Sequence, residues 1–209
     1  AMERFGSDKP DMRFGFELTD ISDIVGKSEF AVFSGAVAAG GSVRAINVKG
    51  GAAFSRKEID ALCEFGKTYK AKGVAWSKNN GGEISSSYIK KLTDAENAAI
   101  AERCSFEEGD LLLIVADKHK VVFDTLGALR PECAKRLGLL DGGDYRFLWV
   151  TDFPLFEYSE EEDRYTAMHH PFTMPNGEDL DMIETDPGRV RAIAYDIVLN
   201  GTELGGGSI

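Results

Sequence analysis

Residues 195–209, YDIVLNGTELGGGSI, decide how the C-terminal part of this 209-residue chain folds. Apolar residues flank the dipeptide Asn200-Gly201, an arrangement that is the strongest short-range signal for a β-hairpin with a two-residue primed turn. Such a turn fixes which residues of the two strands pair. The predicted pairs are Leu199 with Thr202, Val198 with Glu203, and Asp196 with Gly205.

Two carboxylates of this hairpin are predicted to share one face. Side chains alternate between the faces of a strand, and the predicted register places Asp196, Val198, Glu203, Gly205 and Gly207 together. Asp196 and Glu203 would be diagonal neighbours about 7–8 Å apart at the backbone. Magnesium prefers one or two carboxylates together with substrate phosphate oxygens, so this face suits a metal that carries phosphates. On the hairpin alone, a solvent-exposed polar face is the simpler interpretation.

Residues 28–140 are predicted to form one compact α+β unit. The unbroken apolar run at 111–116 indicates a central strand that is buried on both faces. Ser55 and Thr93 each begin a capping box with a glutamate three residues later, which predicts two helix starts. The remaining elements expected are strands at 30–37, 42–48 and 73–77, a short helix at 86–92, a helix at 121–129, and another beginning near Pro131. This block shows no combination of acid, base and nucleophile, which indicates a structural or partner-contacting role.

Composition excludes several classes of protein. With 43% hydrophobic and 28% charged residues, the chain has an ordinary globular composition. It contains neither an apolar run of about 18 residues nor a leader pattern, so we expect no membrane association. Cys63, Cys104 and Cys133 lack metal-site or disulfide spacing, and we expect a reducing, cytoplasmic location. The net charge of −11 argues against a general nucleic-acid binder.

Aromatic and histidine side chains that could contact a ligand occur after Gly143. The alternation of Tyr145, Phe147, Trp149, Thr151 and Phe153 predicts a strand with one aromatic face. His169 and His170 follow, and on a strand adjacent side chains point to opposite faces. The pair therefore cannot chelate one metal from one side. One imidazole is expected to face a ligand while the other packs.

Several strings resemble one enzyme family. FGSDKPDMRF at 5–14, FLWVTDFPLFEY at 147–158, YTAMHHPFTMP at 165–175 and ELGGGSI at 203–209 are similar to bacterial-type aspartyl-tRNA synthetases, which are class II enzymes. The middle of the chain resembles the insertion domain that these synthetases share with tRNA-dependent amidotransferases. The resemblance implies an α+β fold. A compact insertion domain with a mainly antiparallel sheet (28–140) would be flanked by incomplete pieces of the class II catalytic sheet (1–27 and 141–209).

The resemblance also implies a function. His169, His170 and Gly206 would bind aspartate or its adenylate, while Asp196 and Glu203 would bind ATP and Mg²⁺. The parent enzyme, expected to be a homodimer, would attach aspartate to tRNA(Asp). The chain lacks the arginines of class II motifs 2 and 3, so it is expected to be an excised, inactive piece. Two alternatives remain: a noncatalytic tRNA- or protein-contacting module, and a ligase that charges both tRNA(Asp) and tRNA(Asn).

Overall fold

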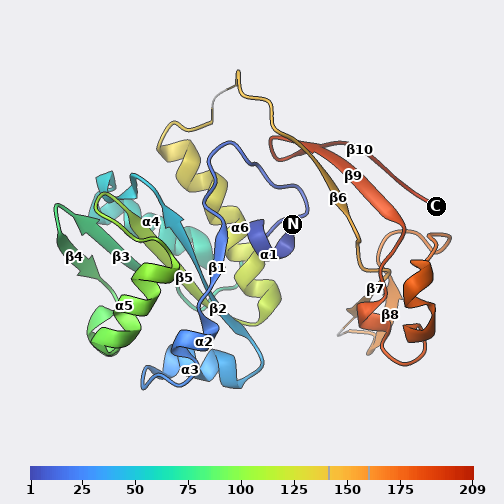
Figure 1. Ribbon diagram of the computed structural model, residues 1–209, viewed down its shortest axis with the longest axis horizontal. Coiled ribbons are helices and arrows are strands. Elements are labelled where there is room, and N and C mark those ends of the chain that lie inside the picture. Colours follow the sequence, from blue (N-terminus) through green and yellow to red (C-terminus); the bar gives the residue numbers. More distant parts are fainter. Residues whose placement is uncertain (141, 160) are drawn as a thin grey trace. The chain divides into compact units, whose positions relative to one another are not determined.

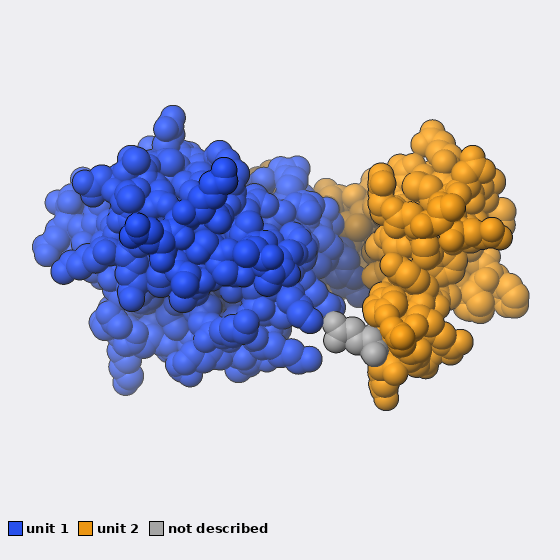
Figure 2. All heavy atoms as spheres, turned by 90° about the horizontal axis from the view of Figure 1, so that it is seen from below, with its two compact units in different colours: residues 1–144 blue, residues 145–209 orange. Residues whose placement is uncertain are grey.

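The chain divides into two compact units (Figure 2), residues 1–144 and residues 145–209. The computed structural model describes residues 1–140, 142–159 and 161–209. Asp141, where the sequence favours a linker, and Glu160, where the run of acidic residues favours a solvated turn, lie outside the described residues. The division of the chain at 27/28 and 140/141 stays a prediction.

Unit 1 is built on a five-stranded antiparallel sheet whose strand order is β1-β2-β5-β3-β4 (Figure 1). The strands are β1 (Leu18–Asp20), β2 (Ser42–Val48), β3 (Ala75–Asn80), β4 (Glu83–Ser86) and β5 (Leu111–Asp117). The helices are α1 (Met2–Phe5), α2 (Ser22–Val25), α3 (Ala31–Ala38), α4 (Arg56–Lys67), α5 (Asp94–Arg103) and α6 (His119–Arg136), with 3₁₀ turns η1 (Gly51–Ala53) and η2 (Ile89–Lys91). The predicted α+β class with mainly antiparallel sheets is confirmed.

β5 lies at the centre of the sheet and is buried on both faces, as the apolar run predicts. Leu111, Leu113 and Val115 enter a core that is closed by α4 and α6. Leu112 and Ile114 point to the other side, into a second core that includes residues of α2, α3 and α5. The alternation of one strand thus supplies both hydrophobic cores of unit 1.

Local capping signals predict two of the helices correctly. Ser55 accepts a hydrogen bond from the backbone N–H of Glu58, and the Glu58 carboxylate accepts one from the N–H of Ser55. Thr93 and Glu96 form the same reciprocal pair at the start of α5. These contacts satisfy N–H groups that a helix start otherwise leaves unpaired.

Two predictions for unit 1 are wrong. Residues 31–38 form helix α3 where a strand was expected, because a short apolar run fits a buried helix as well as a strand. Pro131 does not begin a new helix but lies inside α6, which continues from His119 to Arg136. A proline inside a helix removes one backbone hydrogen bond. Burial of apolar side chains on both sides of Pro131, including Leu126 and Cys133, stabilises the uninterrupted helix.

A buried arginine holds the N-terminal segment on unit 1. Arg130 is 1% exposed. Its guanidinium donates to the carbonyl oxygens of Phe16 at 2.8 Å and Asp11 at 3.0 Å, and also to those of Gly15 and Phe5. It lies over the rings of Phe5 and Phe14 as well. Burial lowers the pKa of Arg130 to about 10, although the charges of Asp11 and Glu17 oppose that shift. One side chain therefore satisfies four backbone carbonyl groups spread over the segment 5–16.

Unit 2 has a three-stranded antiparallel sheet in the order β10-β9-β6 and a separate β7–β8 hairpin. Its elements are β6 (Phe147–Thr151), β7 (Phe156–Ser159), β8 (Arg164–Ala167), η3 (Gly177–Met182), η4 (Pro187–Arg189), β9 (Ala194–Leu199) and β10 (Thr202–Ser208). Its small core contains Val150, Phe153, Leu155, Val190, Ala192 and Val198. In the described part of the chain, no helix has both the length and the apolar composition that crossing a bilayer requires.

We expect Arg130→Met to destabilise unit 1 by about 3 kcal/mol, because several buried carbonyl groups would lose a charged donor. Denaturant unfolding followed by circular dichroism measures the change. Lys135→Met, at an exposed position on the same helix, is the matched control and should change stability little. Equal stability of the Arg130 variant and the wild type would show that the segment is held by other contacts.

Candidate functional site

The hairpin of β9 and β10 forms with the predicted turn. Asn200 and Gly201 have φ angles of 50° and 84°, the left-handed backbone that a type I′ turn requires at both central positions. Leu199 pairs with Thr202 and Val198 pairs with Glu203, as predicted. The local sequence therefore determines the turn and the first pairs.

Beyond Glu203 the register differs from the prediction. A β-bulge lies between Glu203 and Gly205, and Gly205 pairs with Ile197. Asp196 consequently pairs with Gly206, not with Gly205 as expected. Directly paired residues share a face, so Gly206 lies on the face of Asp196. Gly205 and Gly207 lie on the opposite face, and the expected floor of several glycines beside the carboxylates is reduced to one.

Asp196 and Glu203 do share a face of the hairpin. Glu203 pairs with Val198, two residues from Asp196 along β9, which makes the two acids diagonal neighbours. Asp196 is half-buried and Glu203 is exposed. On this face β6 contributes Val150 opposite Asp196, and both Val150 and Val198 are buried in the core of unit 2. The Asp196 carboxylate therefore lies at the edge of a packed layer, whereas Glu203 extends from an exposed position.

The two carboxylates fit magnesium better than a metal held by protein alone. Within residues 1–140, 142–159 and 161–209, no group of three or more His, Cys, Asp or Glu side chains is arranged to hold a metal. Magnesium does not need such a cage, since one or two carboxylates and substrate phosphate oxygens complete its coordination. The donor set of Asp196 and Glu203 is of that type.

Gly206 is required by the close approach of Asp196. A Cβ atom at Gly206 would overlap the Oδ1 atom of Asp196 and would lie 2.9 Å from the carbonyl oxygen of Tyr195. A Cβ atom at Gly205 would have no heavy atom within 4 Å. The two neighbouring glycines thus differ sharply in the space around them.

The histidine pair lies in a different segment of unit 2. His169 lies in a bend after β8 and His170 follows it in irregular backbone, whereas a strand was expected, and both are exposed. The His169 ring lies edge-on to Phe153, with ring centres 4.9 Å apart. The backbone N–H of Phe172 donates to Nδ1 of His170 at 3.2 Å. In neutral His170 the proton is therefore on Nε2, which is a donor.

An ion pair that no sequence motif predicts lies in the segment after the histidines. The Arg191 guanidinium donates to both carboxylate oxygens of the buried Asp179, at 2.8 and 2.9 Å, and the Arg191 backbone N–H donates to Asp179 as well. Arg191 thereby lowers the pKa of Asp179 to about 2. The two residues are 12 apart in the chain and follow no motif, so sequence gave no signal for the pair.

The face of the β10-β9-β6 sheet that lies opposite Asp196 and Glu203 is aromatic and exposed. Trp149 is 62% exposed and meets Tyr195 edge-on, with ring centres 5.8 Å apart. Phe147 and Leu204 are also more than half exposed. The strand with an aromatic side is confirmed at β6, but Phe153 lies beyond its end and is buried in the core of unit 2.

Comparison with known proteins gives consistent matches. A family model described as the GAD domain matches residues 33–126. The whole chain is 62% identical to part of an aspartate–tRNA ligase of Ruminiclostridium cellulolyticum and 61% identical to part of an aspartate–tRNA(Asp/Asn) ligase of Caldanaerobacter subterraneus. An aspartate–tRNA ligase of Clostridium botulinum is 57% identical to it. The chain spans 35% of the length of each of these relatives.

We expect Gly206→Ala to weaken the pairing of β9 and β10 and to destabilise unit 2 by about 1–3 kcal/mol, because the new methyl group overlaps the Asp196 carboxylate. Gly205→Ala is the matched control and should have little effect. Amide hydrogen exchange of residues 194–208 reports on the pairing. Equal protection in the two variants would contradict the register described above.

The Asp179–Arg191 pair predicts a dependence on pH. A carboxylate whose pKa is lowered by folding stabilises the fold above its ordinary pKa, and that contribution is lost as the pH falls through the folded value. Residues 145–209 should therefore lose stability between about pH 4 and pH 2. Asp179→Asn should be less stable at neutral pH and should show a smaller loss on acidification. Exposed Asp181→Asn is the control, and identical pH profiles for all three proteins would contradict the assignment.

Proposed function

This chain carries a GAD domain and is homologous along its whole length to part of the bacterial aspartate–tRNA ligases, and we propose that it forms part of such an enzyme. The enzyme would activate aspartate with ATP and would transfer the aspartyl group to tRNA(Asp). The observation that carries this proposal is the pair Asp196 and Glu203 on one face of the β9–β10 hairpin, with Gly206 beside Asp196.

In the proposed site, Asp196 and Glu203 would hold Mg²⁺ and would thereby help to bind ATP. Bound Mg²⁺ would supply positive charge that neutralises the phosphates of ATP. Asp196 is held at the margin of the packed layer, whereas Glu203 follows the turn and is exposed. Asp196 would therefore fix the position of the site, and Glu203 would adjust to the nucleotide.

Gly206 would keep the space beside Asp196 free of a side chain. Any larger residue would displace the Asp196 carboxylate, as the overlap with a Cβ atom shows. Gly206 would then act in two ways, by letting Asp196 take its position and by leaving backbone exposed to the aminoacyl group. This role falls to one glycine of the three, because the bulge turns Gly205 and Gly207 to the other face.

His169 and His170 would bind the aspartate substrate. With Nδ1 of His170 occupied by the Phe172 N–H, its Nε2–H is the group that can donate to a carboxylate. His169 is oriented by its edge-on contact with Phe153. Both rings are exposed, so they are accessible to a small anionic substrate.

We propose that the choice of tRNA is made by parts of the enzyme outside these 209 residues. A relative named for tRNA(Asp/Asn) and one named without asparagine are 61% and 62% identical to this chain over its full length. Similar identity to relatives of both names agrees with this proposal. We propose a class II catalytic domain, a homodimeric assembly and a cytoplasmic location for the whole enzyme, as the resemblance of its sequence motifs implies. That this chain alone lacks ligase activity stays a prediction.

We expect Glu203→Gln in the whole enzyme to lower aspartate-dependent ATP–pyrophosphate exchange about 10²–10³-fold, because one electrostatic contact to the metal and nucleotide is lost. Asp196→Asn should act in the same direction, and the double variant should fall short of additivity because both groups serve one ion. Transfer of aspartate from preformed adenylate should suffer less than adenylate formation. Glu184→Gln, at an exposed position in the same unit, is the control.

A titration of Mg²⁺ in the ATP–pyrophosphate exchange assay separates a metal site from a merely polar edge of the hairpin. If Glu203→Gln exchanges pyrophosphate at the wild-type rate across that titration, the metal assignment is wrong. Asp196 and Glu203 would then form only a polar edge of the hairpin.

A further inference from the structure

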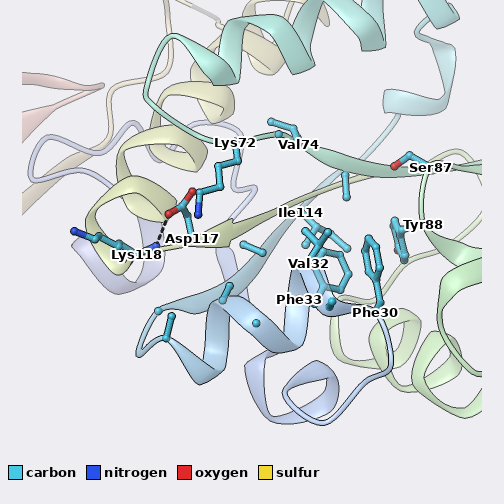
Figure 3. A pocket seen from close by; sticks show the side chains of 18 residues that line it. Phe30, Val32, Phe33, Lys72, Val74, Ser87, Tyr88, Ile114, Asp117 and Lys118 are labelled. Atoms are coloured by element: carbon cyan, nitrogen blue, oxygen red, sulfur yellow. Dashed lines mark hydrogen bonds between the residues drawn. The ribbon is translucent and has the colours of Figure 1, made fainter.

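Unit 1 contains a cavity of about 630 Å³ that the proposed ligase site does not use. It lies between α3 and the strands β5 and β3, and Figure 3 shows the side chains that line it. Its volume falls within the range of small-molecule sites, about 300–1,000 Å³. All of its lining residues belong to unit 1.

One end of this cavity is apolar and aromatic. Phe30, Phe33, Tyr88 and Ile114 line it (Figure 3). Phe30 meets Phe33 edge-on at 4.8 Å, and Phe33 lies 5.8 Å from the Tyr88 ring, measured between ring centres. Because Phe33, Tyr88 and Ile114 are buried and packed together, they form a fixed wall that suits an apolar group.

The other end carries an acid and a base. Asp117 is the last residue of β5 and is 9% exposed. Its Oδ1 atom accepts a hydrogen bond from the Lys118 backbone N–H at 2.9 Å, while its Oδ2 atom is buried and accepts none from the described residues. An unpaired buried carboxylate oxygen costs about 1–3 kcal/mol or more, so a bound donor would be favourable there. Lys72 also lines the cavity, and Figure 3 shows it at the Asp117 end.

We propose that this cavity binds an α-amino acid with an apolar side chain. The ammonium group pairs with Asp117, the carboxylate pairs with Lys72, and the side chain lies against Phe30, Phe33 and Tyr88. Lys72 is exposed, so its long side chain lets the ammonium adjust to the ligand's carboxylate. A zwitterion is neutral overall and matches the opposite charges at that end. Aspartate does not fit, because its side-chain carboxylate would be buried against the aromatic wall without a partner.

Three probes with the same ring and a control separate these contacts. Titration of the 209-residue chain, followed by NMR, compares L-phenylalanine, phenethylamine, 3-phenylpropionate and L-aspartate. Phenylalanine should bind most tightly, and loss of its carboxylate or its ammonium should weaken binding about 10-fold or more. Aspartate should not bind. Aspartate binding as tight as that of phenylalanine, or no saturable binding of phenylalanine, overturns the proposal.

Variants assign each group to its partner. Asp117→Asn should weaken phenylalanine and phenethylamine about 10-fold while leaving 3-phenylpropionate unchanged. Lys72→Met should weaken phenylalanine and 3-phenylpropionate but spare phenethylamine, and Lys57→Met on the exposed face of α4 is the matched control. If both Asp117→Asn and Lys72→Met keep the wild-type affinities for the three ring compounds, the assignment is wrong.

A cavity-filling variant tests the site in a chain that is expected to stay folded. A Cβ atom at Gly35 of α3, which lines the cavity, has no heavy atom within 4 Å. Gly35→Leu should fill the cavity, keep the fold and abolish binding of all three ring compounds. Undiminished phenylalanine binding by a folded Gly35→Leu chain places the site elsewhere and overturns the proposal. Because the measurement uses no ATP and no tRNA, its outcome is independent of the proposed ligase activity.

Discussion

Unit 1 depends on the burial of β5 from both sides. Its side chains alternate between two cores, so each face of the strand must be covered before either core excludes water. α4 and α6 cover one face, and α2, α3 and α5 cover the other. β5 ends at Asp117, which forms the charged end of the cavity with Lys72, whereas Phe30, Phe33 and Tyr88 from other segments form the aromatic end.

Local signals in the sequence predict local structure well. The capping boxes at Ser55 and Thr93 and the Asn200-Gly201 turn are each specified by hydrogen bonds or backbone angles within a few residues. The unbroken apolar run of β5 is likewise sufficient to place a central strand. By contrast, the run at 31–38 has no periodicity that separates a helix from a strand, and only packing on the sheet decides it.

The candidate site is predictable in composition but not in register. Sequence places Asp196 and Glu203 on one hairpin, and the structure keeps them on one face. The bulge after Glu203 escapes prediction because the glycines at 205–207 carry no side chains whose burial would specify a register. The Asp179–Arg191 pair and the Asp117 cavity join residues that are distant in the chain or belong to no motif, so only the folded chain reveals them.

The chain has two tryptophans, and each unit contains one of them. Trp76 on β3 is 5% exposed and lies beneath the Arg56 guanidinium, whereas Trp149 on β6 is mostly exposed to water. Indole emission shifts to longer wavelength as water gains access. The buried and exposed indoles should therefore emit at different wavelengths, and each reports on its own unit. Intrinsic fluorescence can thus distinguish the unfolding of unit 1 from events in unit 2 without any label.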